Sequence, residues 1–142
     1  MSKIVRTLAN AQHLEILNQG AHAWDSWRIK NPRIRPDLSR AQINGRDLRG
    51  ISFDRVNLSR AFLTGMNLRD ANLESANLKQ AILMRTDLEQ AVMSNADLEQ
   101  VHLSSVNLAH SSLDGNPVPR YKCKHGHLIQ RSCLQLRPKQ GS

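Results

Sequence analysis

Aromatic side chains are scarce in this 142-residue chain, where Phe, Trp and Tyr together make up 4% of the residues. Its core must therefore be aliphatic. No run of about 18 apolar residues occurs, so we expect no transmembrane helix and no membrane partner. The first ten residues lack the apolar segment of a secretory signal, and two cysteines do not make a disulfide framework. These absences predict a single compact domain in the cytoplasm.

Motifs that carry known chemistry are also absent. The sequence contains no nucleophile elbow, no glycine-rich phosphate loop and no helical zinc motif built on His and Glu. Four histidines have no neighbours in the sequence that suggest acid–base chemistry, namely His13, His22, His102 and His110. We therefore expect neither enzyme activity nor a cofactor.

The chain instead contains one long repeat, in which a large apolar residue recurs at every fifth position from Leu38 to Leu113. The series has sixteen members, and thirteen of them are leucine. Five residues advance about 500° around a helix axis, which would spread the leucines around it. On a continuous strand the odd spacing would send successive leucines to opposite faces.

A third arrangement fits the period. The residue two positions before each large one is usually small or apolar, as in Ala61 and Ala71, and the remaining two residues are mostly polar or Gly. Each five-residue segment then consists of a short extended side that points two residues inward, followed by a turn. Repeated turns in one sense enclose the leucines.

The pattern Ala-(Asp/Asn)-Leu-x-x resembles the pentapeptide-repeat family. It is seen as Ala71-Asn72-Leu73, Ala76-Asn77-Leu78 and Ala96-Asp97-Leu98, and the resemblance covers residues 36–115. The segment from Trp24 to Arg28 also resembles the helical lead-in of bacterial members. The resemblance implies an all-β solenoid, a right-handed quadrilateral β-helix with four segments per coil and about four coils.

Three units are predicted along the chain. Residues 1–31 form a short helical cap. Its first helix ends at Gly20 and has one apolar face, which consists of Ile4, Leu8, Ala11, Leu14 and Leu17. A second short helix carries Trp24 and Trp27, which cover the first end of the tube, and Pro32 ends it. Residues 32–115 form the β-helix. Residues 116–142 leave the repeat frame and form a basic tail without an apolar period, for which disorder is one interpretation.

Four departures interrupt the inward positions. Arg46 should not be buried without a partner, and we expect it to reach from the open end toward Asp25 or Asp47. Pro36 and Ser111 are interpreted, with Arg46, as frayed ends, and Thr86 as a buried hydroxyl that is hydrogen-bonded.

Stacking residues twenty apart predicts a candidate contact patch. Two sides of the solenoid carry ladders of Asn and Asp, whereas the side with Gln42 and His102 places large apolar residues outward. On a side interpreted as adjacent to it, Val92 interrupts a run of polar residues. The patch consists of Phe62, Ile82, Met84 and Val92. Clustered surface hydrophobes mark a contact. The alternatives are the tail (through Leu128, Ile129 or Leu134), a second copy, or another protein.

Charge is segregated along the chain. Residues 1–69 hold 12 Lys and Arg against 5 Asp and Glu, residues 70–115 hold 2 against 7, and residues 116–142 hold 6 against none. Arg40 stacks near Arg60, and Arg49 near Arg69, at the basic end. We expect nucleic acid to bind at most nonspecifically.

The predicted function is a non-catalytic scaffold that binds a protein partner or itself. One alternative is a DNA-mimicking inhibitor of a type II topoisomerase, as the resemblance implies for some members, although the rod here is short and only partly acidic. The other is a metal-binding tail, since it contains the zinc-competent residues Cys123, His125, His127 and Cys133. Their spacing matches no structural zinc pattern.

Overall fold

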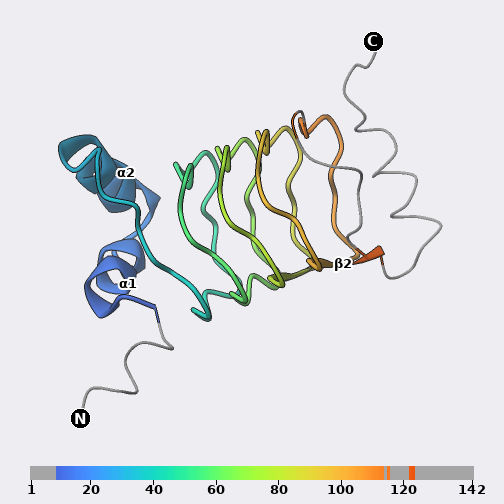
Figure 1. Cartoon of the computed structure of the whole chain (residues 1–142), viewed down its shortest axis with the longest axis horizontal. Helices are drawn as coiled ribbons and strands as arrows, with labels where there is room; N and C mark the ends of the chain where they lie inside the picture. The colour runs from blue at the N-terminus through green and yellow to red at the C-terminus, as the bar shows by residue number, and fades with distance from the viewer. Residues whose placement is uncertain (1–8, 114, 116–121, 124–142) are drawn as a thin grey trace.

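A computed structural model describes residues 9–113, 115 and 122–123 (Figure 1). Two helices precede the repeat, α1 (Ala11–Asn18) and α2 (Ala21–Lys30). The side-chain oxygen of Asn10 accepts hydrogen bonds from two backbone N–H groups of the first turn of α1, at 2.9 and 3.1 Å, and so caps it. Gly20, with a φ of 107°, separates the helices. Both predicted helices are present, while Ile4 and Leu8 lie outside the described residues.

The repeat winds so that residues twenty positions apart lie side by side, as the stacked coils of Figure 1 show. Three short strands make a parallel sheet along one side, β1 (Ile82–Met84), β2 (His102–Ser104) and β3 (Lys122–Cys123). The other sides are joined by isolated parallel bridges with the same register. Four five-residue segments therefore complete one turn of a solenoid.

The interior of the solenoid is filled by the leucine series. All sixteen predicted large residues are buried, from Leu38 at 0% exposure to Leu113 at 8%. The small residues two positions earlier, such as Ala61 and Ala71, are buried beside them. Each buried leucine contributes roughly 1.5–3 kcal/mol relative to an exposed one, before the entropy of ordering is subtracted. The prediction of the inward wall is confirmed.

Each corner of the solenoid contains one residue in the left-handed region. φ lies between 55° and 81° at every fifth position from residue 40 to residue 115, and only four of these sixteen residues are glycine. This conformation costs other residues about 1–2 kcal/mol. Backbone hydrogen bonds to the next turn offset the cost, since Arg60 N–H donates to the Lys79 carbonyl at 2.9 Å and Asp70 N–H to the Glu89 carbonyl at 3.0 Å.

Helix α2 supplies hydrogen-bond partners to the first turn. The N–H of Ser52 donates to Asp25 Oδ1 at 2.9 Å, and its carbonyl accepts from Trp24 Nε1 at 2.7 Å and from Arg28 at 3.0 Å. Arg28 also donates to the carbonyl of Asp54 at 3.0 Å. In later turns the equivalent groups pair with the preceding coil. The side chains of α2 therefore provide the first turn with the hydrogen bonds that a preceding coil provides to each later turn.

Helix α1 supplies hydrogen-bond partners to another side of the first turn. The N–H of Asn10 donates to the Asp37 carbonyl at 2.9 Å, and the N–H of Asp37 donates to His13 Nδ1 at 3.1 Å. The buried ring of Trp24 meets Phe53 edge-on, with centroids 5.6 Å apart. Both helices thus contact the first turn through packing and through its backbone edge.

Two of the polar departures are satisfied inside the solenoid. The hydroxyl of Thr86, which is 1% exposed, donates to the carbonyl oxygen of Leu63, so the prediction for this residue is confirmed. The hydroxyl of Ser111 donates to the Leu108 carbonyl at 2.8 Å, and the residue is buried. Ser111 therefore belongs to the ordered frame, and its interpretation as a frayed end is wrong.

The two departures near the first turn also differ from expectation. Pro36 is buried, and its carbonyl accepts from Asn57 N–H at 2.9 Å, as its counterparts do in later turns. Arg46 is half-buried and makes no ion pair with Asp25 or Asp47 among the described residues. Asp25 is engaged by Ser52, and Asp47 lies 3.8 Å from Arg49. The predicted partners of Arg46 are therefore wrong.

The repeat frame extends beyond residue 115. In β3, Lys122 and Cys123 pair in parallel with His102 and Leu103, again twenty positions away. The expectation that the chain leaves the frame after residue 115 is therefore wrong for these two residues. Among the described residues, neither helix has the length and hydropathy needed to cross a membrane.

Candidate partner-binding face

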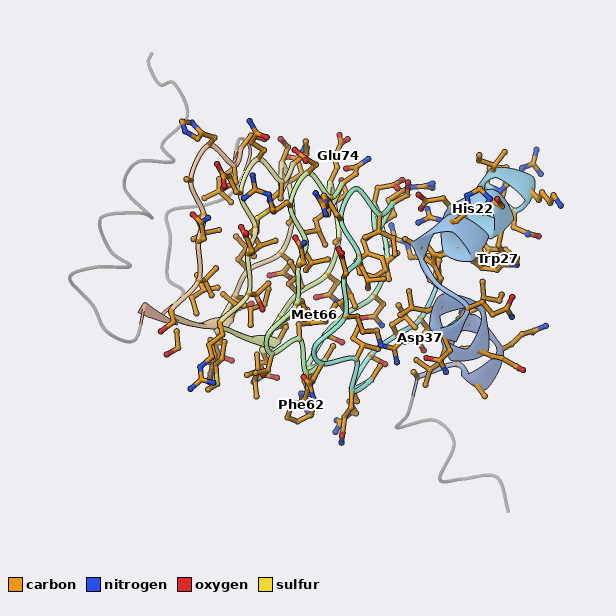
Figure 2. The ribbon with its side chains drawn as sticks, turned by 180° about the vertical axis from the view of Figure 1, so that it is seen from behind. His22, Trp27, Asp37, Phe62, Met66 and Glu74 are labelled. Atoms are coloured by element: carbon orange, nitrogen blue, oxygen red, sulfur yellow. The ribbon has the colours of Figure 1, made fainter. Side chains whose placement is uncertain are left out.

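One side of the solenoid displays apolar residues outward. We call it the sheet face, and it contains the ladder of Gln42, Phe62, Ile82 and His102 together with the rest of β1 and β2. Phe62 is 38% exposed and Met84 is 40% exposed, while Ile82 is half-buried. Figure 2 shows Phe62 projecting outward from one side of the solenoid, at the bottom of the view. Phe62 and Ile82 are bridged neighbours, as the sequence predicts.

Val92 does not belong to the sheet face. It is 39% exposed, but it pairs with Asn72 and Ser112 in a ladder ten positions out of phase with the ladder of Phe62 and Ile82. Because twenty residues make one turn, ten residues are half a turn. Val92 therefore lies on the opposite side, and its assignment to one patch with the other three residues is wrong.

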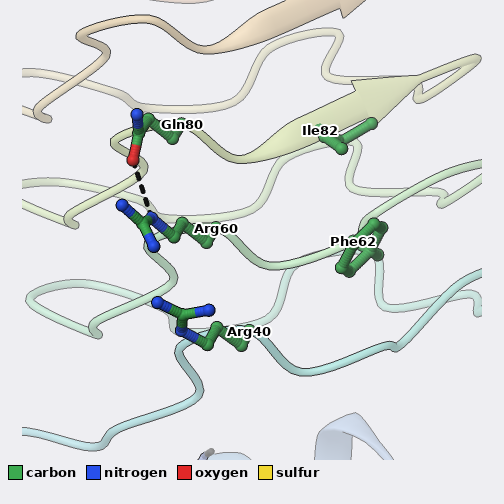
Figure 3. A pocket seen from close by; sticks show the side chains of 5 residues that line it. All are labelled: Arg40, Arg60, Phe62, Gln80 and Ile82. Atoms are coloured by element: carbon green, nitrogen blue, oxygen red, sulfur yellow. Dashed lines mark hydrogen bonds between the residues drawn. The ribbon is translucent and has the colours of Figure 1, made fainter. Parts of the chain in front are cut away.

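A shallow groove of about 350 Å³ runs beside the sheet face (Figure 3). Its lining comes from two columns of side chains. Arg40, Arg60 and Gln80 form a corner column, and Phe62 and Ile82 form an apolar column two residues further along each turn. The residue between the columns is an alanine that points into the core, as at Ala41, Ala61 and Ala81. Nothing projects outward between the walls, so the space stays open.

The corner column is held by side-chain hydrogen bonds. Arg60 Nε donates to Gln80 Oε1 at 2.7 Å, and Gln80 Nε2 donates to Gln100 Oε1 at 2.9 Å. Among the described residues, neither Arg40 nor Arg60 forms an ion pair. The groove therefore has one positive and one apolar wall.

Arginine on another corner is neutralised. Arg69 contacts the carboxylates of Asp87 and Glu89, and hydrogen bonds to these two groups raise its pKa. Sequence reasoning recognised the stacking of Arg40 on Arg60 but missed the groove. The signal for the groove in the sequence was a long corner residue followed, two positions later, by a large residue of the sheet face.

The family model for pentapeptide repeats matches residues 37–74, 51–90 and 81–115, which together span more than half of the chain. The chain belongs to the pentapeptide-repeat family. Members of this family form right-handed quadrilateral β-helices and are generally non-catalytic. No protein with a curated description matches the sequence.

Several solved pentapeptide-repeat structures are similar to this chain. Rfr23 of the cyanobacterium Cyanothece is 29% identical, with a TM-score of 0.52 over 64% of this chain and 66% of that one. A thylakoid-lumen member from Arabidopsis thaliana is 30% identical, with a TM-score of 0.41, covering 56% and 59% of the two chains. HetL of Nostoc, involved in heterocyst differentiation regulation, is 23% identical, with a TM-score of 0.32, covering 64% and 44%. The chain thus spans less than two thirds of each of these structures.

The outward Asn and Asp residues of this pentapeptide-repeat protein make structural hydrogen bonds. Asp37 Oδ1 accepts from Ser39 N–H at 3.0 Å, and Asn57 Oδ1 accepts from Ser59 N–H at 3.1 Å. On further turns, the backbone N–H two positions after each ladder residue donates to that residue's side-chain oxygen in the same way. These carboxylates and amides therefore stabilise corners.

No potential metal site is formed within the described part of this pentapeptide-repeat protein, where no three His, Cys, Asp or Glu residues gather. Of the four candidate ligands, Cys123 is placed by its backbone beside Leu103. His125, His127 and Cys133 lie outside the described residues.

Proposed function

We propose that this pentapeptide-repeat protein is a non-catalytic scaffold that binds a protein partner through its sheet face. The observation that supports this function is the exposure of Phe62 and Met84 beside Ile82 and the groove. Elsewhere the outward ladder positions are mostly Asn, Asp or Ser. Clustered apolar residues on an otherwise polar surface are characteristic of a contact.

The proposed scaffold is a rigid tube of four coils. Helices α1 and α2, within residues 1–31, close its first end through their bonds to Asp37 and Ser52. Residues 32–115 form the coils, and the basic segment 116–142 follows, with β3 continuing the frame. A solenoid of this kind holds side chains at fixed spacing, and we place it in the cytoplasm.

DNA mimicry against a topoisomerase has less support. A mimic needs a continuous negative surface, whereas the acidic residues of the later coils are partly neutralised. Asp87 and Glu89 contact Arg69, and Glu99 lies 3.4 Å from Lys79. A supercoiling assay separates the two functions, because a mimic inhibits the enzyme and a scaffold does not.

Substitution of Ile82 by Glu tests the sheet face. The variant places a charge beside Phe62, where a partner would have to desolvate it. We expect affinity capture from the source cells, measured by quantitative mass spectrometry, to lose the specific partner by about tenfold or more, equivalent to about 1.4 kcal/mol. The melting temperature should stay close to that of the original protein, since Ile82 is only half-buried.

Ile29→Glu is the matched control, because Ile29 is 78% exposed on α2 and lies away from the sheet face. This variant should capture the same proteins as the original chain. Light scattering of all three proteins measures self-association. An unchanged set of captured proteins and an unchanged mass for Ile82→Glu would refute the proposed role of this face.

A further inference from the structure

The groove beside the sheet face is the only corner of the described solenoid with two walls of long side chains on adjacent turns. At the other corners the residues in the equivalent positions are short on at least one side, except where Gln90 stands opposite Val92. There the neighbours of Val92 on the adjacent turns, Asn72 and Ser112, are short. Gly45 stands opposite Asp47, Gly65 opposite Asn67, and Ser75 opposite Asn77. Because the backbone has the same conformation at every corner, the groove arises from the residues that occupy this corner.

We infer that this groove binds an extended acidic segment of the protein partner, with its carboxylates on Arg40 and Arg60 and a large apolar side chain on Phe62 and Ile82. The inference rests on the proposed function and names the chemistry of the ligand. Guanidinium groups bind carboxylates through paired, charge-assisted hydrogen bonds.

Arg60 is oriented for this role before any ligand arrives. Its Nε is engaged by Gln80, which is in turn engaged by Gln100. Its two terminal nitrogens make no hydrogen bond to the described residues. Fixing the side chain in advance reduces the entropy lost on binding. Gln80 is thus a positioning residue, while Arg40 and Arg60 contact the ligand.

The chain's own ends do not suit the groove. The residues outside the described ranges are basic, with Lys3 and Arg6 near the start and five Lys and Arg after residue 115. Their single acidic residue is Asp114. Either end would bring positive charge to a positive wall, so charge complementarity favours an external acidic ligand over both ends.

The spacing of the walls favours an extended peptide. Arg60 and Phe62 are separated by one residue that points inward, and side chains two apart on an extended chain lie about 6.6 Å apart. A ligand strand crossing the groove along the same direction presents its own residues with this spacing. Such a strand can place a carboxylate at the positive wall and, two positions later, a large apolar side chain at the apolar wall.

A nucleic acid is a poorer match. The positive wall extends over only two turns, about 5 Å apart, and the column continues with the neutral Gln80 and Gln100. Among the described residues, a phosphate backbone would meet no further cation in this column, and its sugars would offer little to the apolar wall. Two carboxylates neutralise the two guanidinium groups of the site.

Fluorescence polarisation with a defined peptide tests the inference. The probe is fluorescein-labelled Gly-Ser-Glu-Glu-Ser-Leu-Ser-Gly, compared with versions in which Lys replaces both Glu residues or Ser replaces Leu. We expect the acidic apolar peptide to bind most tightly. Arg60→Gln or Arg40→Gln should weaken it about tenfold, the usual effect of losing one hydrogen bond to a charged group. Salt should weaken it too.

Glutamine is a suitable replacement because the fold already accepts it at this position. Gln80, Gln90 and Gln100 occupy equivalent corners with φ between 57° and 61°. Arg55→Gln is the matched control, since Arg55 is an exposed corner residue with a φ of 61° outside the groove. It should bind the peptide like the original protein.

Three outcomes would overturn the inference. The first is no binding, or equal binding of the Lys peptide. The second is tighter binding of a labelled oligonucleotide that depends on the same two arginines. The third is a doubled mass in light scattering that Arg60→Gln returns to that of a monomer, which would make a second copy the occupant. If Ile82→Glu still loses its partner in these cases, the proposed function stands and only the ligand class is wrong.

Discussion

At the residue scale, individual side chains take roles that depend on the register they occupy. Thr86 occupies an inward position where a hydroxyl reaches backbone carbonyls, so its satisfaction was predictable from the repeat alone. The environment of Arg46 was not, because the presumed acidic partners are engaged elsewhere. Periodicity assigns a direction to a side chain, but it does not identify a partner brought in by a different element.

His13 is the residue for which the structure predicts a pH effect. Its Nδ1 accepts a hydrogen bond from the Asp37 backbone N–H at 3.1 Å, and its ring lies against Trp27. Burial lowers the pKa of His13 below its usual value, while the Asp37 carboxylate opposes that shift. Only the neutral ring can accept this bond.

The folded state therefore binds a proton at His13 less readily than the unfolded state does. The stabilising contribution of this hydrogen bond is fully present above the unfolded pKa of about 6.5, and it is lost as the pH falls from there through the lower pKa of the folded state. Urea unfolding between about pH 5 and 8 should show this loss. His13→Gln should remove that component of the pH dependence, and His22→Gln, on the exposed part of α2, should retain it. Identical profiles for both variants would contradict the assignment.

At the element scale, the helices take the place of a neighbouring coil. The sequence predicted two helices and a covering role for the tryptophans, because helical spacing and Pro32 are local signals. It did not predict that Arg28 reaches the carbonyls of Ser52 and Asp54. Those contacts join residues more than twenty positions apart, and their geometry exists only after the repeat has closed into a solenoid.

Arg28→Met tests the contact between α2 and the first turn. Methionine retains much of the buried stem but leaves the Asp54 carbonyl without its donor. The free energy of unfolding should fall by about 1–3 kcal/mol, the usual cost of an unsatisfied buried group. Lys30→Met, at the exposed end of the same helix, should change it by less than about 0.5 kcal/mol. Equal losses would indicate that the bonds of Arg28 contribute nothing specific.

At the scale of the whole molecule, a twenty-residue turn converts sequence spacing into position on a face. This rule predicted the ladders and the pairing of Phe62 with Ile82. The error over Val92 arose at the same scale, since a shift of ten residues was treated as a neighbouring side instead of the opposite one. The groove was missed because it is formed by two columns of side chains on either side of a corner. It can be recognised only when the two columns are considered together, since neither column alone indicates a groove.

A five-residue insertion should separate the fold from the proposed binding face. Duplicating residues 71–75 after residue 75 keeps every later leucine inward, so the solenoid should still form. The insertion moves the present Ile82 a quarter turn and brings the present Asn77 beside Phe62. The change in unfolding free energy should be small, because the number of buried residues does not fall. Peptide binding and partner capture should be lost.

Duplicating residues 91–95 after residue 95 is the matched control. It adds the same number of residues but leaves the register from Arg40 to Ile82 intact, so the groove is preserved. This protein should unfold like the first insertion variant and still bind the acidic peptide, with only the support of Gln100 to Gln80 replaced. Circular dichroism and urea unfolding measure the fold, and polarisation measures the groove. Equal binding by the two insertion variants would show that the alignment of the two columns across successive turns does not create the site.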